Sequence, residues 1–298
     1  MSVHRAGYVA LVGRPNVGKS SLLNALLGRK VSIVTPRPQT TRRRVMGVLN
    51  TYDAQLVFFD TPGLHGGGRR RLNRVMNESA RSALADADVV LVVVDVRRLD
   101  DADRSVLAAA RDSGRPVVIA LNKIDLVRPR RAMLPRVEAV AALCPGAELV
   151  PVSARRRENT DQLVSVVTAA LPECEALFPP EMVTDSDVPT QIAEIVREKL
   201  MLHLQDELPY GIAVHLERFD ASEQGLVHAG AVIWVEQERH KAIVIGSQGR
   251  MLKTIGTAAR RELEKLLERK VYLELWVKVR ADWADDDAAL REAGYLGQ

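Results

Sequence analysis

The feature that most constrains this chain is a glycine-framed loop between a predicted strand and a predicted helix. The apolar run 8–12 precedes the loop Gly13-Arg14-Pro15-Asn16-Val17-Gly18-Lys19-Ser20, and leucines recur at helical spacing after it. Gly13 and Gly18 can adopt backbone angles closed to other residues, so successive N–H groups can turn inward around phosphate oxygens. The helix that begins near Lys19 adds the positive end of its dipole. A glycine-rich turn without a ligand is the simpler alternative, but a loop in this context predicts phosphate binding.

The residue types of the loop predict separate roles. Lys19 is expected to reach the β- and γ-phosphates of a nucleotide, and the Ser20 hydroxyl is expected to bind Mg²⁺. We expect nucleotide contacts from Gly13, Arg14, Pro15, Asn16, Val17, Gly18, Lys19, Ser20 and the next residue, Ser21. The loop alone does not separate ATP from GTP.

A second motif identifies the base. Asn122-Lys123-Ile124-Asp125 comes directly after the apolar run 117–121. The Asp125 carboxylate can accept hydrogen bonds from N1–H and the exocyclic amine of guanine, whereas adenine would leave a buried charge unpaired. Asn122 can bond a purine N7 or tie the loop to its neighbours, and the Lys123 stem can cover the base. Asn and Asp also end strands in ordinary turns, but after a phosphate loop this motif predicts GTP.

Two further short loops follow apolar strands. Asp60-Thr61-Pro62-Gly63 follows the run 56–59, and it predicts a carboxylate that holds Mg²⁺ through water and an N–H of Gly63 that senses the γ-phosphate. Ser153-Ala154 follows the run 149–152, where the backbone could meet guanine O6. Four loops in this order, each at the carboxyl end of a strand, match the ligand crevice of an open α/β sheet.

With these motifs in order, the first half of the chain resembles a TRAFAC-class GTPase. The segment Pro38-Gln39-Thr40-Thr41-Arg42 resembles switch I, whose threonine binds Mg²⁺ and covers the γ-phosphate. The resemblance assigns that role to Thr41, with Thr40 as the second choice, while an exposed basic loop is the simpler alternative. It implies Lys19, Thr41 and Gly63 as catalytic residues, and Ser20, Thr41 and Asp60 as Mg²⁺ ligands.

The residue after the Asp60–Gly63 motif departs from Ras-type GTPases, in which a glutamine orients the attacking water. Here that residue is Leu64, which is also an expected nucleotide contact. The resemblance therefore implies slow intrinsic turnover and a K⁺ ion bound by Asn16 beside the phosphates. The arginines at 42–44 are a competing source of positive charge. His65 as a general base is disfavoured, because phosphoryl transfer relies chiefly on positioning and electrostatics.

Length and composition set the outer limits. A chain of 298 residues is long enough for two domains. Its longest apolar run, at 89–94, is far shorter than the roughly 18 residues that span a bilayer, and no secretory h-region is seen. Cys144 and Cys174 have no metal-binding spacing, so we expect reduced thiols and a cytoplasmic protein. The net charge of +4 matters because basic residues cluster in the second half.

The order of predicted elements changes after the helix 160–171. The proline-containing stretch 172–189 reads as a linker. Beyond it, hydrophobic spacing predicts a helix at 191–204, strands at 212–218 and 231–236, and a continuation of the second strand at 242–245. A helix after residue 249 and a strand at 271–278 complete this half.

The loop Gly246-Ser247-Gln248-Gly249 stands before basic residues of that last helix. This arrangement resembles a type II KH domain, whose GxxG loop clamps about four nucleotides of RNA backbone, although a simple strand-to-helix turn is the alternative. His203, His215 and His240 could contact bases, but we expect ordinary strand or helix residues. The resemblance implies RNA contacts from Lys241, Gly246, Ser247, Gln248, Gly249, Arg250 and Lys253.

A GTPase joined to a KH domain is similar to the Era-like GTPases over essentially the whole chain. The resemblance implies a mostly parallel α/β P-loop GTPase domain at 1–175, a linker at 176–188 and an α+β type II KH domain at 189–298. The run Gly66-Gly67-Gly68-Arg69-Arg70-Arg71 departs from the family pattern in switch II.

The same resemblance implies a function. It predicts a monomeric switch that binds GTP and GDP, holds RNA near the 3′ end of small-subunit ribosomal RNA, and acts in 30S subunit assembly. Two rivals stay open. One is an RNA-binding scaffold gated by GTP and GDP with negligible turnover. The other is a signalling GTPase associated peripherally with the inner face of the membrane, which the basic surface alone would favour.

Overall fold

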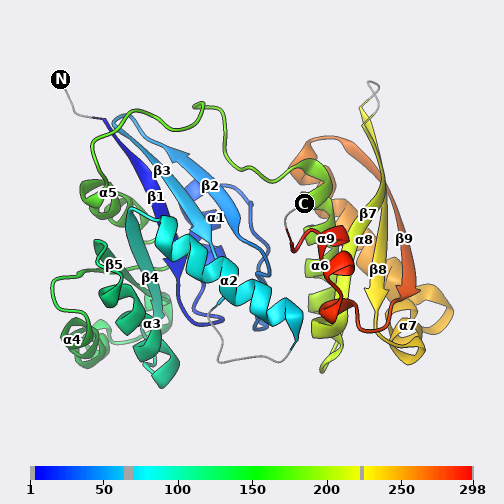
Figure 1. Ribbon diagram of the computed structural model, residues 1–298, viewed down its shortest axis with the longest axis horizontal. Coiled ribbons are helices and arrows are strands. Elements are labelled where there is room, and N and C mark those ends of the chain that lie inside the picture. Colours follow the sequence, from blue (N-terminus) through cyan, green and yellow to red (C-terminus); the bar gives the residue numbers. More distant parts are fainter. Residues whose placement is uncertain (1–3, 64–69, 222–224, 297–298) are drawn as a thin grey trace. The chain divides into compact units, whose positions relative to one another are not determined.

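The computed structural model describes residues 4–63, 70–221 and 225–296 (Figure 1). The chain divides into two compact units. Unit 1 comprises Met1–Gly67 and Met76–Asp185, and unit 2 comprises Gly68–Val75 and Ser186–Gln298.

Unit 1 is built on a six-stranded sheet in the order β2-β3-β1-β4-β5-β6. β2 runs antiparallel to β3, and the remaining pairs are parallel. The predicted mixed, mostly parallel sheet is therefore confirmed, although β2 carried no recognised sequence signal. The strands are β1 (Arg5–Val12), β2 (Val45–Asn50), β3 (Ala54–Asp60), β4 (Val89–Asp95), β5 (Val117–Asn122) and β6 (Glu148–Pro151).

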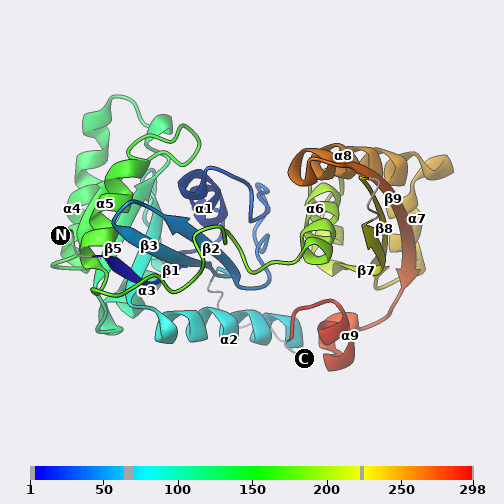
Figure 2. The ribbon, with the colours of Figure 1, turned by 90° about the horizontal axis from the view of Figure 1, so that it is seen from above.

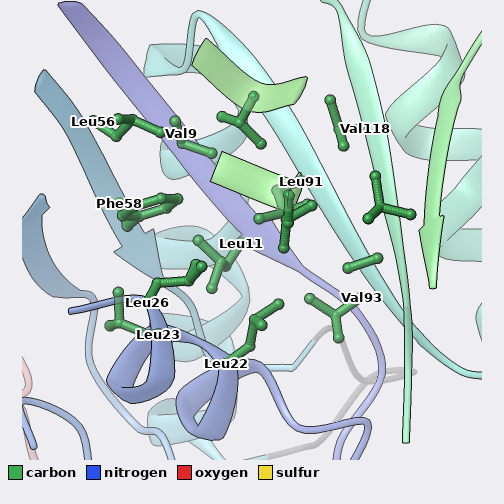
Figure 3. Packing of buried hydrophobic residues seen from close by; sticks show 14 of the residues in the cluster. Val9, Leu11, Leu22, Leu23, Leu26, Leu56, Phe58, Leu91, Val93 and Val118 are labelled. Atoms are coloured by element: carbon green, nitrogen blue, oxygen red, sulfur yellow. The ribbon is translucent and has the colours of Figure 1, made fainter. Parts of the chain in front are cut away.

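Helices cover both faces of this sheet, which explains why its central strands are apolar along their whole length. One face packs against α1 (Lys19–Leu27) and α5 (Thr160–Ala170), and Figure 3 shows leucines of α1 meeting the side chains of β1, β3 and β4. The other face packs against α3 (Asp101–Asp112) and α4 (Leu134–Leu143). Ala83 of α2 (Arg71–Asp86) packs there on β2 and β3. Figure 2 shows α1 and α2 on opposite sides of these strands.

The stretch predicted as a linker is hydrogen-bonded to unit 1 over much of its length. The backbone N–H of Ala6 donates to Pro172 O at 3.3 Å, and that of Val48 donates to Val183 O at 2.8 Å. The buried Gln55 amide donates to Phe178 O at 2.8 Å and accepts from the backbone N–H of Phe178 at 2.9 Å. Residues up to Asp185 accordingly belong to unit 1.

Unit 2 has a three-stranded sheet in the order β7-β8-β9, in which β7 is antiparallel and β9 parallel to β8. One face of the sheet packs against α6 and α8 around a single apolar core. This arrangement confirms the predicted α+β KH domain. The elements are α6 (Val188–His203), β7 (Ile212–Ala221), β8 (Leu226–Val235), α7 (Glu238–Ile245), α8 (Arg250–Leu267), β9 (Lys270–Val279) and α9 (Asp287–Glu292).

The prediction that residues 242–245 continue the second strand is wrong. β8 ends at Val235, and these residues form the last turn of α7. The apolar run Ala242-Ile243-Val244-Ile245 suggested a strand, but Val244 is the buried member and Ile243 is 54% exposed. One buried side chain per turn is a helical pattern, and the backbone N–H of Gly246 closes the helix on Ala242 O at 2.9 Å.

Candidate functional site

The predicted phosphate-binding loop joins β1 to α1 at the carboxyl edge of the sheet. Gly13 and Gly18 have φ angles of +157° and +103°, and a Cβ on Gly18 would lie 2.4 Å from Nδ2 of Asn122. Lys19 is buried, and its Nζ donates to Gly13 O at 3.0 Å. The pKa of Lys19 is lowered to about 8, mainly because the ammonium group is buried. A bound phosphate would supply the negative charge that favours the protonated lysine.

The three predicted Mg²⁺ ligands lie together beside this loop. Ser20 Oγ donates to Asp60 Oδ2 at 2.6 Å, and Thr41 Oγ1 lies 2.9 Å from Ser20 Oγ and 3.4 Å from Asp60 Oδ2. Burial raises the pKa of Asp60. Its Oδ1 is buried without a hydrogen-bond partner among the described residues. Mg²⁺ prefers hard oxygen ligands and retains bound waters, so this donor set fits a hydrated Mg²⁺.

Ser32 is a member of this cluster that the sequence analysis missed. Its Oγ donates to Asp60 Oδ2 at 2.7 Å. Asn24 of α1 fixes its backbone, since the Asn24 amide accepts from Ser32 N at 3.0 Å and donates to Ser32 O at 2.7 Å. Ser32 belongs to no recognisable motif, so the sequence offered no signal for it.

Within the switch I segment, Thr40 and Thr41 have different hydrogen-bond partners. Thr40 Oγ1 donates to Arg37 O at 2.8 Å and lies 2.6 Å from Thr35 Oγ1, so it bonds within its own loop. Thr41 lies with Ser20 and Asp60 as described above. Asn16 has a φ of +64°, and its Nδ2 donates to Pro36 O at 3.0 Å. The loop residue expected to bind K⁺ thus contacts the segment that leads into switch I.

Arg14 directs its side chain out of the phosphate loop. Its Nε is 3.0 Å from both carboxylate oxygens of Asp103 in α3, and both side chains are buried. Asp100, the N-cap of α3, lies 3.4 Å from the same Nε. The main chain of Arg14 is therefore the part of this residue that is available to contact a phosphate. The sequence analysis missed Asp103, although an Asp three residues after the N-cap Asp100 is a helix-start signal.

Asp125 lies beside Ser153, whose Oγ donates to Asp125 Oδ1 at 2.7 Å. Asn122 ties three loops together, which is the second of the two roles left open for it. Its Nδ2 donates to Val17 O at 2.9 Å, and its Oδ1 accepts from the backbone N–H groups of Lys123 and Ala154 at 2.8 and 3.0 Å.

Lys123 is held by Asp95, another residue missed in the sequence. The Lys123 ammonium lies 2.9 Å from Asp95 Oδ2 and donates to Asn16 O at 2.5 Å. Arg97 donates to both oxygens of Asp95. Burial alone would raise the pKa of Asp95, but the hydrogen bonds from Arg97 and Lys123 outweigh it and hold the pKa well below its usual range. An aspartate at the end of β4 was the available signal.

The remaining residues of the site lie close to the phosphate loop or serve the core. Thr61 Oγ1 donates to Leu11 O at 2.8 Å. Gly63 approaches Pro15 so closely that a Cβ there would lie 3.0 Å from its ring. Val17 and Ile124 are fully buried, and Pro15, Ser21 and Gly63 line one hollow with Lys19. Leu64, His65 and the glycines at 66–68 lie outside the described residues.

The GxxG loop of unit 2 joins α7 to α8. Gly246 and Gly249 have φ angles of +71° and +74°, and a Cβ on Gly246 would lie 2.7 Å from Cβ of Met251. Gln248 also has a positive φ of 53°. Ser247 is exposed, and the Arg250 guanidinium donates to its Oγ at 3.2 Å. The loop therefore presents its backbone and the side chains of Ser247 and Gln248 to solvent.

An open groove runs from this loop between α8 and β9. A Cβ on Gly256 of α8 would lie 3.3 Å from Leu275 of β9, so a glycine allows the two elements to approach. The sequence analysis included Gly249 and Lys253 but missed the rest of the lining, and Lys241 on α7 is not part of it. The groove is lined by Gly249, Leu252, Lys253, Gly256, Thr257, Arg260, Leu273 and Leu275.

Of the three histidines considered as base contacts, two have other surroundings in the structure. His203 Nδ1 lies 2.8 Å from Lys199 O in its own helix. His215 packs on Trp234 with ring centroids 4.3 Å apart. Neither His203 nor His215 lines the groove.

Comparisons with known proteins cover both halves of the chain. A model of the 50S ribosome-binding GTPase family matches residues 8–123, and a KH domain model matches residues 207–284. GTPase Era of Xanthomonas axonopodis pv. citri is 47% identical over 294 residues, covering 99% of this chain and 98% of that protein. GTPase Era of Pseudomonas aeruginosa is 46% identical over 291 residues, covering 98% and 95%.

Two solved structures resemble the chain over nearly its whole length. A crystal structure of Era in complex with MgGDPNP and nucleotides 1506–1542 of 16S ribosomal RNA is 41% identical with a TM-score of 0.94. A crystal structure of an Aquifex aeolicus Era variant bound to GDP·AlF4⁻ is 42% identical with the same TM-score. Each covers 98% of this chain and 99% of the other.

Proposed function

The chain belongs to the Era family of GTPases, and from that premise we propose that it is a GTP-hydrolysing switch that binds the 3′ region of small-subunit ribosomal RNA in 30S subunit assembly. The observation that carries the switch is the meeting of Ser20 in the phosphate loop, Thr41 in switch I and Asp60 after β3 within hydrogen-bond distance. These side chains come from three separate motifs. A γ-phosphate and Mg²⁺ at this point would hold switch I, and loss of the γ-phosphate would release it.

For nucleotide binding, we propose that the guanine edge donates to Asp125, which the Ser153 hydroxyl orients at 2.7 Å. Lys19 and the backbone N–H groups of its loop would bind the β- and γ-phosphates. Mg²⁺ neutralises charge that develops on the phosphate oxygens. Ser20 and Thr41 would hold it directly, and Asp60 would hold it through water.

For hydrolysis, the chain's own residues mainly position and stabilise. The Gly63 N–H would orient the γ-phosphate, and Thr41 would cover it from switch I. We propose that K⁺ supplies the additional positive charge beside Asn16, because two of the three competing arginines are buried or paired with other groups. Arg42 is buried, and Arg44 lies over the Phe59 ring at 4.3 Å and pairs with Asp86 at 3.4 Å.

For RNA binding, we propose that the backbone of the RNA passes over Gly246–Gly249 while its bases enter the groove between α8 and β9. Gly246 and Gly249 carry no side chain that would keep phosphates away from the backbone. Arg250 and Lys253 follow directly and add positive charge. In the related Era structure the RNA in the complex is nucleotides 1506–1542 of 16S ribosomal RNA. The same region is the RNA that we propose for this chain.

The proposal also concerns the location of the protein, its oligomeric state and the boundary between its domains. We propose a cytoplasmic monomer, with the two domains separated near Asp185, within the expected linker 176–188. Among the described residues, no helix has the length and apolarity needed to cross a bilayer. Peripheral association with the inner face of the membrane has only the basic surface in its favour. It would require binding to anionic vesicles that persists at physiological salt.

A single-turnover assay tests the proposal against a scaffold without turnover. The protein is loaded with radiolabelled GTP and Mg²⁺, and phosphate release is followed with K⁺ or Na⁺, with and without the RNA fragment. We expect GTP hydrolysis in the presence of K⁺, and we expect its rate to change when the RNA fragment is added. Release no faster than that of a Lys19→Ala control under every condition would favour the scaffold.

A further inference from the structure

The sheet of unit 2 has a second face, opposite the groove, on which aromatic side chains are exposed. Leu273 and Leu275 of β9 pack toward the helices and line the groove. Successive side chains of a strand point to opposite faces, so Tyr272 and Trp276 lie on the other face. Their exposed fractions are 53% and 40%. Exposed apolar groups matter as a binding surface where they are grouped into one patch.

Trp276 rests on a glycine of the neighbouring strand. A Cβ on Gly230 of β8 would lie 2.7 Å from Cζ3 of the indole, so only a glycine lets the ring lie there. Ala229 and Ala231 on either side belong to the core, which places Gly230 on the same outer face as Trp276. The edge of the indole at Cζ3 thus lies against the bare strand, while 40% of the residue stays exposed to solvent.

Tyr272 continues this surface along β9. Its ring centroid lies 5.4 Å from that of His228, its register partner on β8. We name the surface formed by His228, Gly230, Tyr272 and Trp276 the aromatic face. α9 covers the end of the sheet beyond it, because Arg280 lies over Trp234 and pairs with Glu292 of that helix.

The charges around the aromatic face are mixed. Arg218 lies beside Gly230 in the register, and Lys270 begins β9. Asp220 lies beside His228 and Glu274 lies beside Gly230 in the same registers. These two carboxylates offset the positive charges of Arg218 and Lys270. A polyanion would therefore gain little here from charge alone. Aromatic rings bind instead by stacking, which every nucleobase can do.

The aromatic face is continuous with the groove through one strand. β9 pairs only with β8 among the described strands, so it forms the edge of the sheet. The groove lies on one side of this edge strand and the aromatic face on the other. An RNA strand that extends beyond the groove would pass around β9 to reach the rings.

We propose that single-stranded RNA leaving the groove passes around the edge strand β9 and stacks bases on Tyr272 and Trp276. The inference rests on the RNA-binding function proposed above and adds a second contact to it. The first contact clamps the backbone and is sensitive to salt. The second binds bases through the aromatic face and neutralises few phosphates.

Tryptophan fluorescence tests this contact directly. Trp276 is the exposed one of the three tryptophans, because Trp234 and Trp283 are 4% and 0% exposed. The full-length protein is titrated with nucleotides 1506–1542 of 16S ribosomal RNA and with truncations from either end. We expect the shortest binding fragments to leave the emission unchanged. Longer fragments should quench it and bind about 5- to 150-fold tighter for each stacked base.

Three variants separate stacking from general damage. Tyr272→Ala should remove affinity only for the longer fragments, and Trp276→Phe should remove the quenching while keeping a ring on Gly230. Phe219→Ala is the matched control, because Phe219 is 39% exposed in β7 but pairs beside Ala229, whose side chain is in the core. It should change neither quantity. The gain from RNA length should also persist from low to moderate salt.

The outcomes distinguish the two levels of the argument. If no RNA of any length binds the wild-type protein, the proposed RNA-binding function fails. If short RNA binds but added length gives neither quenching nor affinity, the stacking inference is overturned and the groove stands. It is equally overturned if Tyr272→Ala leaves RNA binding unchanged but abolishes self-association in sedimentation, since the aromatic face would then contact a second copy of the chain.

Discussion

Removing the Arg14 side chain should destabilise unit 1 by an amount that depends strongly on pH. Arg14 and Asp103 form a buried ion pair with 6% and 1% of their side chains exposed, and their contact joins the phosphate loop to α3. Burial raises the pKa of Asp103 even with Arg14 beside it. Arg14→Met keeps the apolar stem but leaves the Asp103 carboxylate in the protein interior without its main counter-charge.

The size of the penalty follows from protonation. A buried carboxylate whose charge is uncompensated can escape by binding a proton, which costs 1.36 kcal/mol for each pH unit above its unfolded pKa of about 3.9. The penalty therefore cannot exceed about 4 kcal/mol at pH 7 and about 1.5 kcal/mol at pH 5. The sign is that of an acid whose folded pKa is raised. Such an acid loses stability as pH rises from the unfolded pKa toward the folded one.

Urea unfolding of Arg14→Met and wild type at both pH values measures this difference. All three tryptophans lie in unit 2, so tryptophan fluorescence reports that unit and should remain unchanged. Far-UV circular dichroism reports both units, and it should show the loss of stability in unit 1. Arg130→Met is the matched control, because its pair with Glu158 is largely exposed and should contribute less than about 1 kcal/mol. Adding Asp103→Leu to Arg14→Met should recover most of the loss, less about 1 kcal/mol for the cap of α3. A penalty for Arg14→Met that is equal at pH 5 and pH 7 would refute the reasoning.

Three further variants test the nucleotide site. Asp125→Asn should shift preference from GTP toward xanthosine triphosphate, measured by competition binding, because an amide donates where xanthine presents an oxygen; unchanged guanine selectivity would remove Asp125 from base recognition. Gly18→Ala should reduce GTP affinity at least tenfold by isothermal titration calorimetry, since its Cβ would lie 2.4 Å from Asn122 Nδ2 at a φ of +103°; wild-type affinity would show that the loop tolerates the methyl group. Asn16→Ala should erase the difference between hydrolysis rates in K⁺ and Na⁺, and equal wild-type rates in the two salts would point to an arginine or RNA instead.

The sequence predicted the parts of this protein that depend on local pattern. The strand, loop and helix around Lys19 and the loops at the ends of β3, β5 and β6 all follow from apolar runs that end in small or polar residues. Their convergence was predictable, because parallel strands bring their carboxyl ends to one edge of a sheet. The choice between Thr40 and Thr41 needed the structure, since neighbouring threonines have the same chemistry and only the fold directs one toward Asp60.

The residues that the sequence did not reveal act through tertiary contacts. Ser32 reaches Asp60 only because Asn24 holds its backbone, and Asp95 reaches Lys123 only because β4 and β5 are neighbours. Arg14 stands in the phosphate loop and would be read as a phosphate ligand, yet a carboxylate 89 residues away takes its side chain. The run 242–245 has strand propensity, but in the fold it forms the last turn of α7 with Val244 buried.

The linker shows the same limit. Prolines and acidic residues in 172–189 are typical of a connecting segment, and no local pattern shows that Gln55 in β3 will bond Phe178. A buried amide that finds most of its partners in a distant segment is a property of the folded chain. The boundary between the units therefore moves to the end of that segment.

The affinity for RNA in two nucleotide states tests the central claim most directly. The full-length protein is titrated with nucleotides 1506–1542 of 16S ribosomal RNA in the presence of Mg²⁺ with GDPNP or with GDP, alongside Ser247→Asp combined with Gln248→Asp. The account predicts tighter binding with GDPNP than with GDP, and broad loss of RNA affinity in the double variant while its GTP affinity is unchanged. Equal RNA affinity in both nucleotide states would contradict a switch, and wild-type RNA affinity in the double variant would place the RNA contact away from the GxxG loop.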